Sequence, residues 1–303
     1  MRASTSANTR RAYTQHWRQF TEYCARRRRA ALPADARTVC AYLAVAADAG
    51  RRPSTIGQAV AAITFVHRLA KHTLPSAYPE VRTLLQGIRR TVGTEQRQMR
   101  PLLLDDMHQM MATLEGCGLR DVRDRAVILL SWSLMLRRSE LCALDVRDVE
   151  LRRGCVVVTI RRSKTDQAGQ GISKSVARLP VDHASVCPAR AVQAWLEVML
   201  LKSGPLFRRL DGGVLRSERM SDQAVYRLVK RLAAEVGIDP GQISPHSALR
   251  AGPTTALVMA GVPTHLVARM GRWKTAAMVD QYARPGQGEE MAAMARALGA
   301  VKP

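Results

Sequence analysis

The sequence lacks any long apolar run. No stretch of its 303 residues approaches the ~18 consecutive apolar residues that a membrane-spanning helix needs. The opening segment, MRASTSANTR, also lacks the apolar stretch of a secretory signal peptide. These absences argue against a membrane anchor and against export, so we expect a cytoplasmic protein.

Paired cysteines and nucleotide-binding loops are missing as well. Structural zinc sites usually take their cysteine ligands in closely spaced pairs, whereas the cysteines of this chain are well separated and form no CxxC pair. We therefore predict reduced thiols and no metal site. No GxxxxGK phosphate loop occurs, which argues against nucleotide hydrolysis, and we expect no cofactor. The six cysteines are Cys24, Cys40, Cys117, Cys142, Cys155 and Cys187.

Acidic residues are scarce. The chain has 25 Asp and Glu against 47 Lys and Arg, which gives a formal net charge of +22 and a pI near 11. Such a charge favours a polyanionic partner, and without a membrane anchor the favoured polyanion is nucleic acid. The alternative is a surface that is basic only for solubility. Hydrophobic residues make up 47% of the chain, enough for a buried core, and the length suits two domains.

Aromatic residues make up only 4% of the chain, so the positions of individual ones are informative. Near the amino terminus, apolar residues at steps of three and four predict a helix with one buried face; they are Tyr13, Trp17, Phe20 and Cys24. The RRRR run at 26–29 closes this helix, either as a solvated helix end or as a phosphate contact. Further helices are predicted over 35–47, 53–71 and 78–91, so a first domain, 1–91, is expected to be all-helical.

A polar stretch with turn residues, 92–101, predicts a linker to a second domain over 102–303. A helix is predicted to begin at Asp105 and Asp106, which we interpret as a cap and a first-turn acid rather than as metal ligands. The hydrophobic period changes after residue 145, and 155–164 and 175–181 predict the two strands of an antiparallel hairpin. Helices are predicted again over 187–202, over 221–236 and from 253 onward.

Several polar and aromatic residues look out of place in this pattern. They are Arg137 and Glu140 in LRRSEL, Lys164 in RRSKTD, His246 and Arg250 in PHSALR, and Trp273 and Tyr282, nine residues apart, in GRWKTAAMVDQY. In this order, and over nearly the whole chain, the set closely resembles the tyrosine recombinase family, also called phage integrases. Trp273, and the HSA that follows Pro245, resemble the Cre-like branch more than the Xer branch. Arg138 is expected to face outward.

The resemblance implies a fold and an activity. The implied fold is mainly α, with a helical, SAM-like core-binding domain that clamps DNA, then an α+β catalytic domain with a small antiparallel sheet and a carboxyl-terminal helix. The implied enzyme is a site-specific DNA recombinase that cleaves and rejoins strands through a 3′-phosphotyrosine, without metal or ATP. The implied partners are double-stranded recombination sites and a homo-tetramer on two synapsed sites, formed from free monomers or weak oligomers. Such an enzyme would work at the nucleoid.

The chemistry explains why these residue types are needed. Cleaving a phosphodiester requires a nucleophile, neutralisation of the non-bridging oxygens, and a proton for the leaving oxygen. A phenol has a pKa of about 10 and must lose its proton during the attack, which is the role of Tyr282. Guanidinium groups hold phosphate oxygens bidentately and stay charged, so Arg137 and Arg250 suit a clamp on the scissile phosphate.

The remaining roles follow from the resemblance. Lys164 would be the general acid that protonates the departing 5′ oxygen, and His246 would assist proton movement and contact the phosphate. The indole N–H of Trp273 is a donor suited to a phosphate oxygen. Glu140 lies three residues after the first arginine on the same helix face and would orient its neighbours rather than react. Lys174, on the far side of the same predicted loop, is an alternative to Lys164.

The pattern departs from the family at one point. The family usually separates this histidine and arginine by three residues, whereas HSALR places Arg250 four residues after His246. In an α-helix one extra residue turns a side chain by about 100°. Because Pro253 is disfavoured inside a helix, we predict that a helix begins near 252–253 and that 246–250 form a turn or a distorted helix end.

Other interpretations stay open at this stage. Residues 254–272 have the helix-turn-helix character of a DNA-binding regulator, and an inactive relative is a similar alternative. A type IB topoisomerase would share the chemistry but act as a single subunit. Tyr282 by itself would be interpreted as a packing residue. The segment 288–300 predicts a short amphipathic helix that docks either on a neighbouring subunit or on its own domain.

Overall fold

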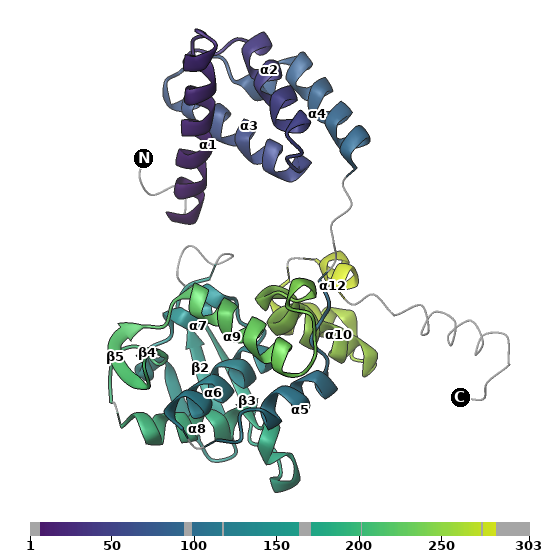
Figure 1. The fold of residues 1–303 in the computed structure, drawn as a ribbon. Helices are drawn as coiled ribbons and strands as arrows, with labels where there is room; N and C mark the ends of the chain where they lie inside the picture. The colour runs from purple at the N-terminus through teal and green to yellow at the C-terminus, as the bar shows by residue number, and fades with distance from the viewer. Residues whose placement is uncertain are drawn as a thin grey trace, which may run out of the picture. The chain divides into compact units, whose positions relative to one another are not determined.

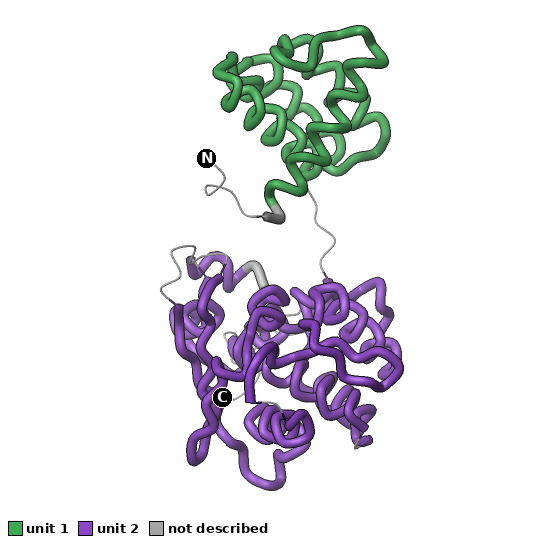
Figure 2. The backbone as a smooth tube through the Cα atoms, turned by 90° about the vertical axis from the view of Figure 1, so that its left-hand side faces the viewer, with its two compact units in different colours: residues 1–97 green, residues 98–303 purple. Residues whose placement is uncertain are grey.

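The chain forms two compact units, residues 1–97 and 98–303 (Figure 2). The computed structural model describes residues 7–93, 99–116, 118–163, 171–200, 202–273 and 275–282. Each unit has its own hydrophobic core. No helix in these ranges is both long and apolar enough to cross a bilayer.

The first unit is helical in all its regular structure, as predicted. Its α-helices are α1 (Ala7–Arg26), α2 (Ala36–Asp48), α3 (Pro53–Leu69) and α4 (Pro79–Val92) (Figure 1). Pro53 and Pro79 stand in first turns, where the missing N–H has no helical partner to lose. Asp35 caps α2 by accepting the backbone N–H of Thr38 at 2.6 Å. The core closes around Phe20, whose ring meets that of Tyr42 with the centroids 5.2 Å apart.

The second unit combines helices with two small antiparallel sheets (Figure 1). Its α-helices are α5 (Leu104–Ala112), α6 (Leu119–Ser133), α7 (Arg138–Ala143), α8 (Pro188–Met199), α9 (Asp222–Glu235), α10 (Gly252–Met259), α11 (Thr264–Gly271) and α12 (Ala276–Tyr282). The strands are β1 (Val149–Arg152), β2 (Cys155–Ile160) and β3 (Ile172–Ala177) in one sheet, and β4 (Arg208–Asp211) and β5 (Val214–Arg219) in the other. The architecture is therefore mainly α with small antiparallel sheets, as the sequence predicted.

The three-stranded sheet sets one face toward the core. In the central strand β2, Val156, Val158 and Ile160 are buried, because alternate side chains point to the same side of a strand. Val158 lies opposite Lys174 in the β2–β3 register, so this lysine belongs to the inward-facing row. The predicted hairpin is thus confirmed as β2 and β3, with its register now known.

Helix α6 lies at the centre of the second unit. Its residues 126–130 are all at most 2% exposed, so this part of the helix is buried on every side. It packs against α8, and Figure 1 shows the two helices side by side. Because its end leads directly into the turn before α7, the core fixes the position of the first predicted site residues.

One local prediction needs correction, and three strands were missed. The cap of α5 is Leu103, not Asp105, and Asp106 at the third helical position accepts the backbone N–H of Leu103 at 3.0 Å. Strands β1, β4 and β5 were not predicted. In β5 every residue is exposed or half-buried, so the strand has no alternating apolar pattern to reveal it.

Candidate active site

The site begins at the turn between α6 and α7. Arg137 is the residue before α7, and Glu140 in the first turn accepts the backbone N–H of Arg137 at 2.9 Å and its Nη1 at 2.6 Å. The Glu140 side chain is 1% exposed. Burial alone would raise the pKa of Glu140, but the guanidinium of Arg272 and the hydrogen bonds from Arg137 outweigh it and lower that pKa. Glu140 is therefore a buried carboxylate that accepts hydrogen bonds from two guanidinium groups.

Arg138 does not simply face outward, contrary to the prediction. It is half-buried, and its Nη1 donates to the backbone carbonyl of Asp222 at 3.3 Å. This bond links α7 to the start of α9. Arg138 therefore ties α7 to α9, while Arg137 pairs with Glu140.

Arg250 joins three separate segments. Its Nη1 donates to the carbonyl of Met135 at 2.9 Å and its Nη2 to the carbonyl of Gly271 at 2.8 Å. Its guanidinium carbon lies 4.3 Å from the ring centroid of Trp273, a cation–π contact. With only 1% of its surface exposed, Arg250 holds its charge at a fixed place beneath the site.

The extra residue in HSALR is absorbed by a π-helical turn over Ser247–Ala251. The backbone N–H of Gly252 bonds to the carbonyl of Ser247, a five-residue step that fits one more residue into the turn than an α-helix does. Helix α10 then begins at Gly252, which confirms the predicted helix start. Gly252 has no room for a side chain, since a Cβ there would lie 2.2 Å from the carbonyl oxygen of Leu102.

Trp273 and His246 meet at the surface of this cluster. Their rings are 6.1 Å apart and nearly perpendicular, with His246 exposed and Trp273 only 9% exposed. Trp273 folds back over Gly271, where a Cβ would lie 2.2 Å from the indole Nε1. The glycine therefore allows the indole to pack beside Arg250, and the structure brings His246, Arg250 and Trp273 together as predicted.

Lys174 also enters the site. Its Nζ donates to the carbonyl of Leu134 at 3.3 Å and to the carbonyl of Met270. Burial, and then the positive charges of Arg272 and Arg250, lower the pKa of Lys174 to about 8. Lys164 lies outside the described residues, so the choice between the two lysines as proton donor stays open. The structure places Lys174 among the arginines.

The lowered pKa makes a prediction about stability. Between pH 8 and about 10.4, the usual lysine pKa, the unfolded chain binds this proton more tightly than the folded chain. The free energy of unfolding of wild type minus that of Lys174→Met should therefore rise with pH in this window, by at most about 1.4 kcal/mol per pH unit. Below pH 8 this difference should not change with pH. Urea unfolding from pH 7 to pH 10 measures it.

Lys202→Met, at an exposed position, is the matched control, because it shows how much of the pH dependence comes from removing any lysine. A wild-type minus Lys174→Met difference that stays constant across the window would contradict the buried, charge-crowded environment of Lys174.

The base of the loop that follows β2 is held by ion pairs. Arg161 contacts Asp145 at 2.6 Å and Asp148 at 2.8 Å, and Arg219 contacts Asp145 at 2.6 Å. Burial would raise the pKa of Asp145, but hydrogen bonds from Arg219 and Arg161 lower it. This network fixes the backbone just before Lys164 and was not predicted from the sequence.

Tyr282 is the last residue of α12, which packs against α10 and α11. Val279 of this helix is fully buried in a small cluster with Val267 and Trp273, so the helix is anchored to the site. The side chain of Tyr282 lies outside the described part of the chain. The predicted approach of its ring to Arg137 and Arg250 therefore stays a prediction.

Sequence reasoning missed Arg272. Its Nη2 donates to Glu140 at 2.7 Å and to the carbonyl of Met135 at 3.3 Å. The available signal was its place between Gly271 and Trp273, within the segment GRWKTAAMVDQY that carries two of the predicted site residues.

Comparison with known proteins gives consistent matches. The model of the phage integrase family matches residues 100–288. The integrase/recombinase xerD homolog of Selenomonas ruminantium is 30% identical, over 93% of this chain and 83% of that protein. Recombinase cre of Escherichia phage P1 is 25% identical, over 95% of this chain and 89% of that protein. Relatives of both the Xer and the Cre kind are matched, so the predicted nearness to the Cre-like branch stays a prediction.

Solved structures share the fold. XerH recombinase in a post-cleavage complex with a palindromic difH substrate matches with a TM-score of 0.62 and 16% identity, over 86% of this chain and 72% of that one. A lambda integrase (75–356) dimer bound to a COC′ core site matches with a TM-score of 0.61 and 17% identity, over 94% of this chain and 92% of that one. The predicted fold class is thereby confirmed.

Proposed function

The chain belongs to the phage integrase family and is a tyrosine site-specific recombinase that cleaves and rejoins DNA strands, and on this premise we propose that Tyr282 is its nucleophile. One observation carries this assignment. Next to the helix that ends in Tyr282, guanidinium groups from three segments converge on a single buried carboxylate and one carbonyl. Such an excess of fixed positive charge would stabilise the negative charge on a phosphate in the transition state.

The proposed chemistry proceeds by transesterification. The phenolic oxygen of Tyr282 attacks the phosphorus and passes its proton to a base, for which His246 is the candidate. The bond from phosphorus to the 5′ oxygen breaks, and that oxygen takes a proton from a lysine. Arg137 and Arg250 bind the non-bridging oxygens, where charge accumulates. The product is a 3′-phosphotyrosine and a free 5′ hydroxyl. A 5′ hydroxyl from another strand reverses the step, so the ester bond is conserved and ATP is not needed.

The supporting roles are assigned as follows. Lys164 is the proposed proton donor, with Lys174 beside the arginines as the alternative. His246 moves a proton and contacts the phosphate, and Trp273 donates its indole N–H while packing on Arg250. Glu140 acts only by holding Arg137 and its neighbours in place.

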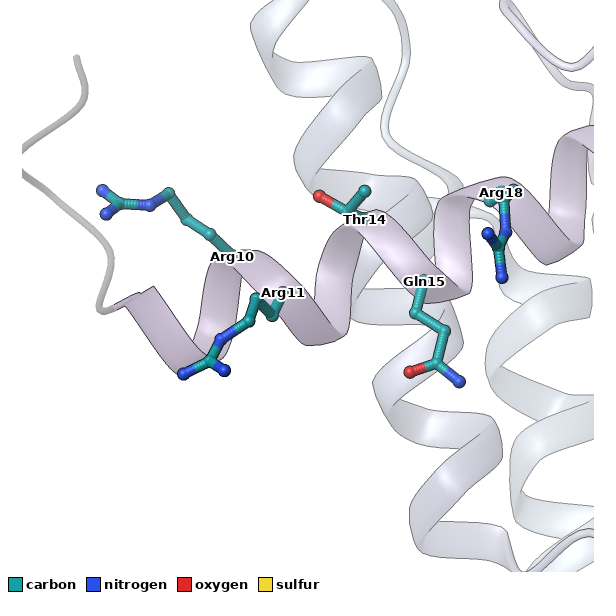
Figure 3. Close-up of a pocket in the computed structure, with 5 residues that line it drawn as sticks. All are labelled: Arg10, Arg11, Thr14, Gln15 and Arg18. Carbon is teal, nitrogen blue, oxygen red and sulfur yellow. The ribbon is translucent and has the colours of Figure 1, made fainter. Parts of the chain in front are cut away.

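The first unit, which we propose as the DNA clamp, offers a basic helix face. Figure 3 shows the exposed side chains on the amino-terminal half of α1, which line a hollow of about 590 Å³. Four of them follow helical spacing, i, i+3, i+4 and i+7, and so share one face. Arginine suits phosphate contacts, and glutamine suits an adenine edge in the major groove. The five residues are Arg10, Arg11, Thr14, Gln15 and Arg18.

This face predicts a change in salt dependence. Each phosphate that a protein neutralises contributes about −0.9 to the slope of log K against log salt. We therefore expect Arg11→Gln and Arg18→Gln each to make the slope less steep by about 0.9, with little change in sequence preference. The ion pair from Arg18 to Glu22, 3.6 Å long with both side chains mostly exposed, does not compete strongly.

Fluorescence anisotropy with a random-sequence duplex across a salt series measures the slope. Arg37→Gln, an exposed arginine of α2 in the same unit, is the matched control. If all three variants change the slope equally, the effect comes from net charge and not from the α1 face.

We further propose that the working form is a homo-tetramer on two synapsed sites, built from protomers that are monomers or weak oligomers when free. The terminal segment 288–300, which lies outside the described residues, is proposed to dock on a neighbouring subunit. The proposed location is the nucleoid, where the charge of +22 meets DNA. Deleting the residues after 285 should weaken assembly on paired sites in sedimentation experiments, while single-site binding persists.

Covalent capture tests the proposed function and supplies a substrate. A pool of nicked duplexes with random sequence is incubated with the protein, and adducts that survive denaturant are isolated and sequenced. Nicking lets the cleaved strand diffuse away, so the ester accumulates instead of being resealed. A recombinase enriches one sequence class as adduct. A regulator would give only reversible, salt-sensitive binding.

A further inference from the structure

Arg272 occupies a backbone position that favours glycine. It follows α11 with φ 55° and ψ 45°, in the left-handed region. The N–H of Trp273 bonds to the carbonyl of Ala268 at 2.9 Å, and the N–H of Arg272 bonds to the carbonyl of Arg269 at 3.3 Å. These two bonds form a Schellman motif, and its left-handed residue is most often glycine because a Cβ is strained there. An arginine at this place has a less favourable backbone conformation than a glycine would have.

The side chain of Arg272 is buried but only partly bonded. It is 9% exposed, and Nη2 makes the contacts to Glu140 and to the Met135 carbonyl described above. Its Nε and Nη1 are buried and have no hydrogen-bond partner in the ranges that the structure describes. Buried donors are nearly always paired in folded proteins, so two orphaned N–H groups on one guanidinium indicate an absent acceptor.

The local charge indicates that this acceptor is an anion. Arg250 and Arg272 donate to the same carbonyl, that of Met135, and both lower the pKa of nearby Lys174. Among the described residues, the ion pairs of this cluster involve one carboxylate, Glu140, which is shared between Arg137 and Arg272. Buried like charges destabilise the fold unless an opposite charge lies beside them.

We propose that Arg272 is a further phosphate-binding residue of the site, which donates one of its two N–H groups that are unpartnered among the described residues, on Nε or on Nη1, to a non-bridging oxygen of the scissile phosphate. The proposal rests on the proposed function, because the phosphate is the one that Tyr282 attacks. It adds a third guanidinium to Arg137 and Arg250. The strained backbone places that guanidinium directly before Trp273, on the segment that leads to α12.

The variants separate this role from a structural one. Arg272→Gln removes the charge, Arg272→Lys keeps a charge without the planar fork, and Arg272→Gly suits the left-handed backbone if the glutamine variant does not fold. Arg269→Gln is the matched control, since Arg269 is an exposed arginine one turn earlier on α11. Circular dichroism and thermal melting first establish that each variant is folded.

The readout is the rate of adduct formation on a duplex obtained by covalent capture. Arg272→Gln should slow it about 100-fold or more, the usual effect of losing one preorganised donor, and Arg272→Lys should recover only part of this. The same duplex is then made with a methylphosphonate at the cleaved linkage, which replaces one charged oxygen with a methyl group. On one of the two diastereomers the ratio of wild-type to Arg272→Gln rates should shrink at least about tenfold. Equal ratios on the phosphate and on both diastereomers would show that Arg272 acts only through the fold and would overturn the proposal.

An anion titration keeps this test separate from the proposed function. If wild type captures no duplex, the proposed function fails, and thermal melting with inorganic phosphate at constant ionic strength still tests Arg272. We expect wild type and Arg269→Gln to be stabilised alike, and Arg272→Gln to bind phosphate about tenfold more weakly. Identical stabilisation of all three proteins would overturn the proposal.

Discussion

Tyr282→Phe should form no covalent adduct with a duplex that wild type captures. Phenylalanine keeps the ring but lacks the oxygen that bonds to phosphorus, so no neighbouring group restores the ester. Reversible binding to the same duplex should stay within a few-fold of wild type, because the arginines of the site and of α1 are unchanged. Denaturing gels of the labelled strand measure the adduct, and anisotropy measures the binding.

Tyr226→Phe is the matched control for this change. Tyr226 is a half-buried tyrosine of α9 in the same unit, and its ring lies 5.3 Å from Nζ of Lys230. The control should form the adduct at the wild-type rate. If Tyr282→Phe still gave a denaturant-resistant adduct, another residue would be the nucleophile, and the assignment of Tyr282 would be wrong.

Of the substitutions proposed, Glu140→Gln should lower the free energy of unfolding the most. The carboxylate lies 2.6 Å from Arg137 and 2.7 Å from Arg272, and its side chain is 1% exposed. Glutamine keeps the shape but leaves two guanidinium groups without their counter-charge, and breaking a buried pair in this way costs about 3–5 kcal/mol. For a unit of this size the melting temperature should fall by roughly 6–20 °C, which calorimetry measures.

The sign of the pH dependence follows from the lowered pKa of Glu140. Its ion-pair contribution is fully present above the pKa of an unfolded glutamate, about 4.3, and is lost as pH falls through the lower folded pKa. The difference between wild type and Glu140→Gln should therefore shrink only in acid. Glu218→Gln, at an exposed position of β5, is the control and should stay within about 0.5 kcal/mol of wild type. A similarly small effect at Glu140 would mean that its ion pairs contribute nothing net.

The sequence predicted those parts of the fold that have a local signature. Apolar steps of three and four marked α1, a proline marked the first turn of α3, and a short run rich in valine marked β2. Strand β5 has no such signature, because its side chains are mostly exposed and its pairing comes from the β4–β5 turn. Likewise, Pro253 predicted where α10 begins, but the π-helical geometry before it depends on Gly252 fitting against Leu102.

The same distinction holds in the site. Arg137, His246, Arg250 and Trp273 were predicted because they stand in motifs of a known family, and the structure brings them together. Arg272, which was not predicted, and Lys174, which was predicted only as the alternative to Lys164, join them through tertiary contacts. The first depends on a left-handed residue at the end of α11, and the second on the register between β2 and β3. Neither the left-handed residue nor the strand register follows a repeating pattern in the sequence.

The peptide carbonyl of Met135 has a consequence for how the site can vary. This single oxygen receives Nη1 of Arg250 and Nη2 of Arg272, and Met135 itself holds a left-handed conformation with φ 49°. A rotation of that one peptide plane would remove a hydrogen-bond acceptor from both guanidinium groups at once. The two guanidinium groups thus share one acceptor, so a substitution that shifts the short turn after α6 should affect both of them.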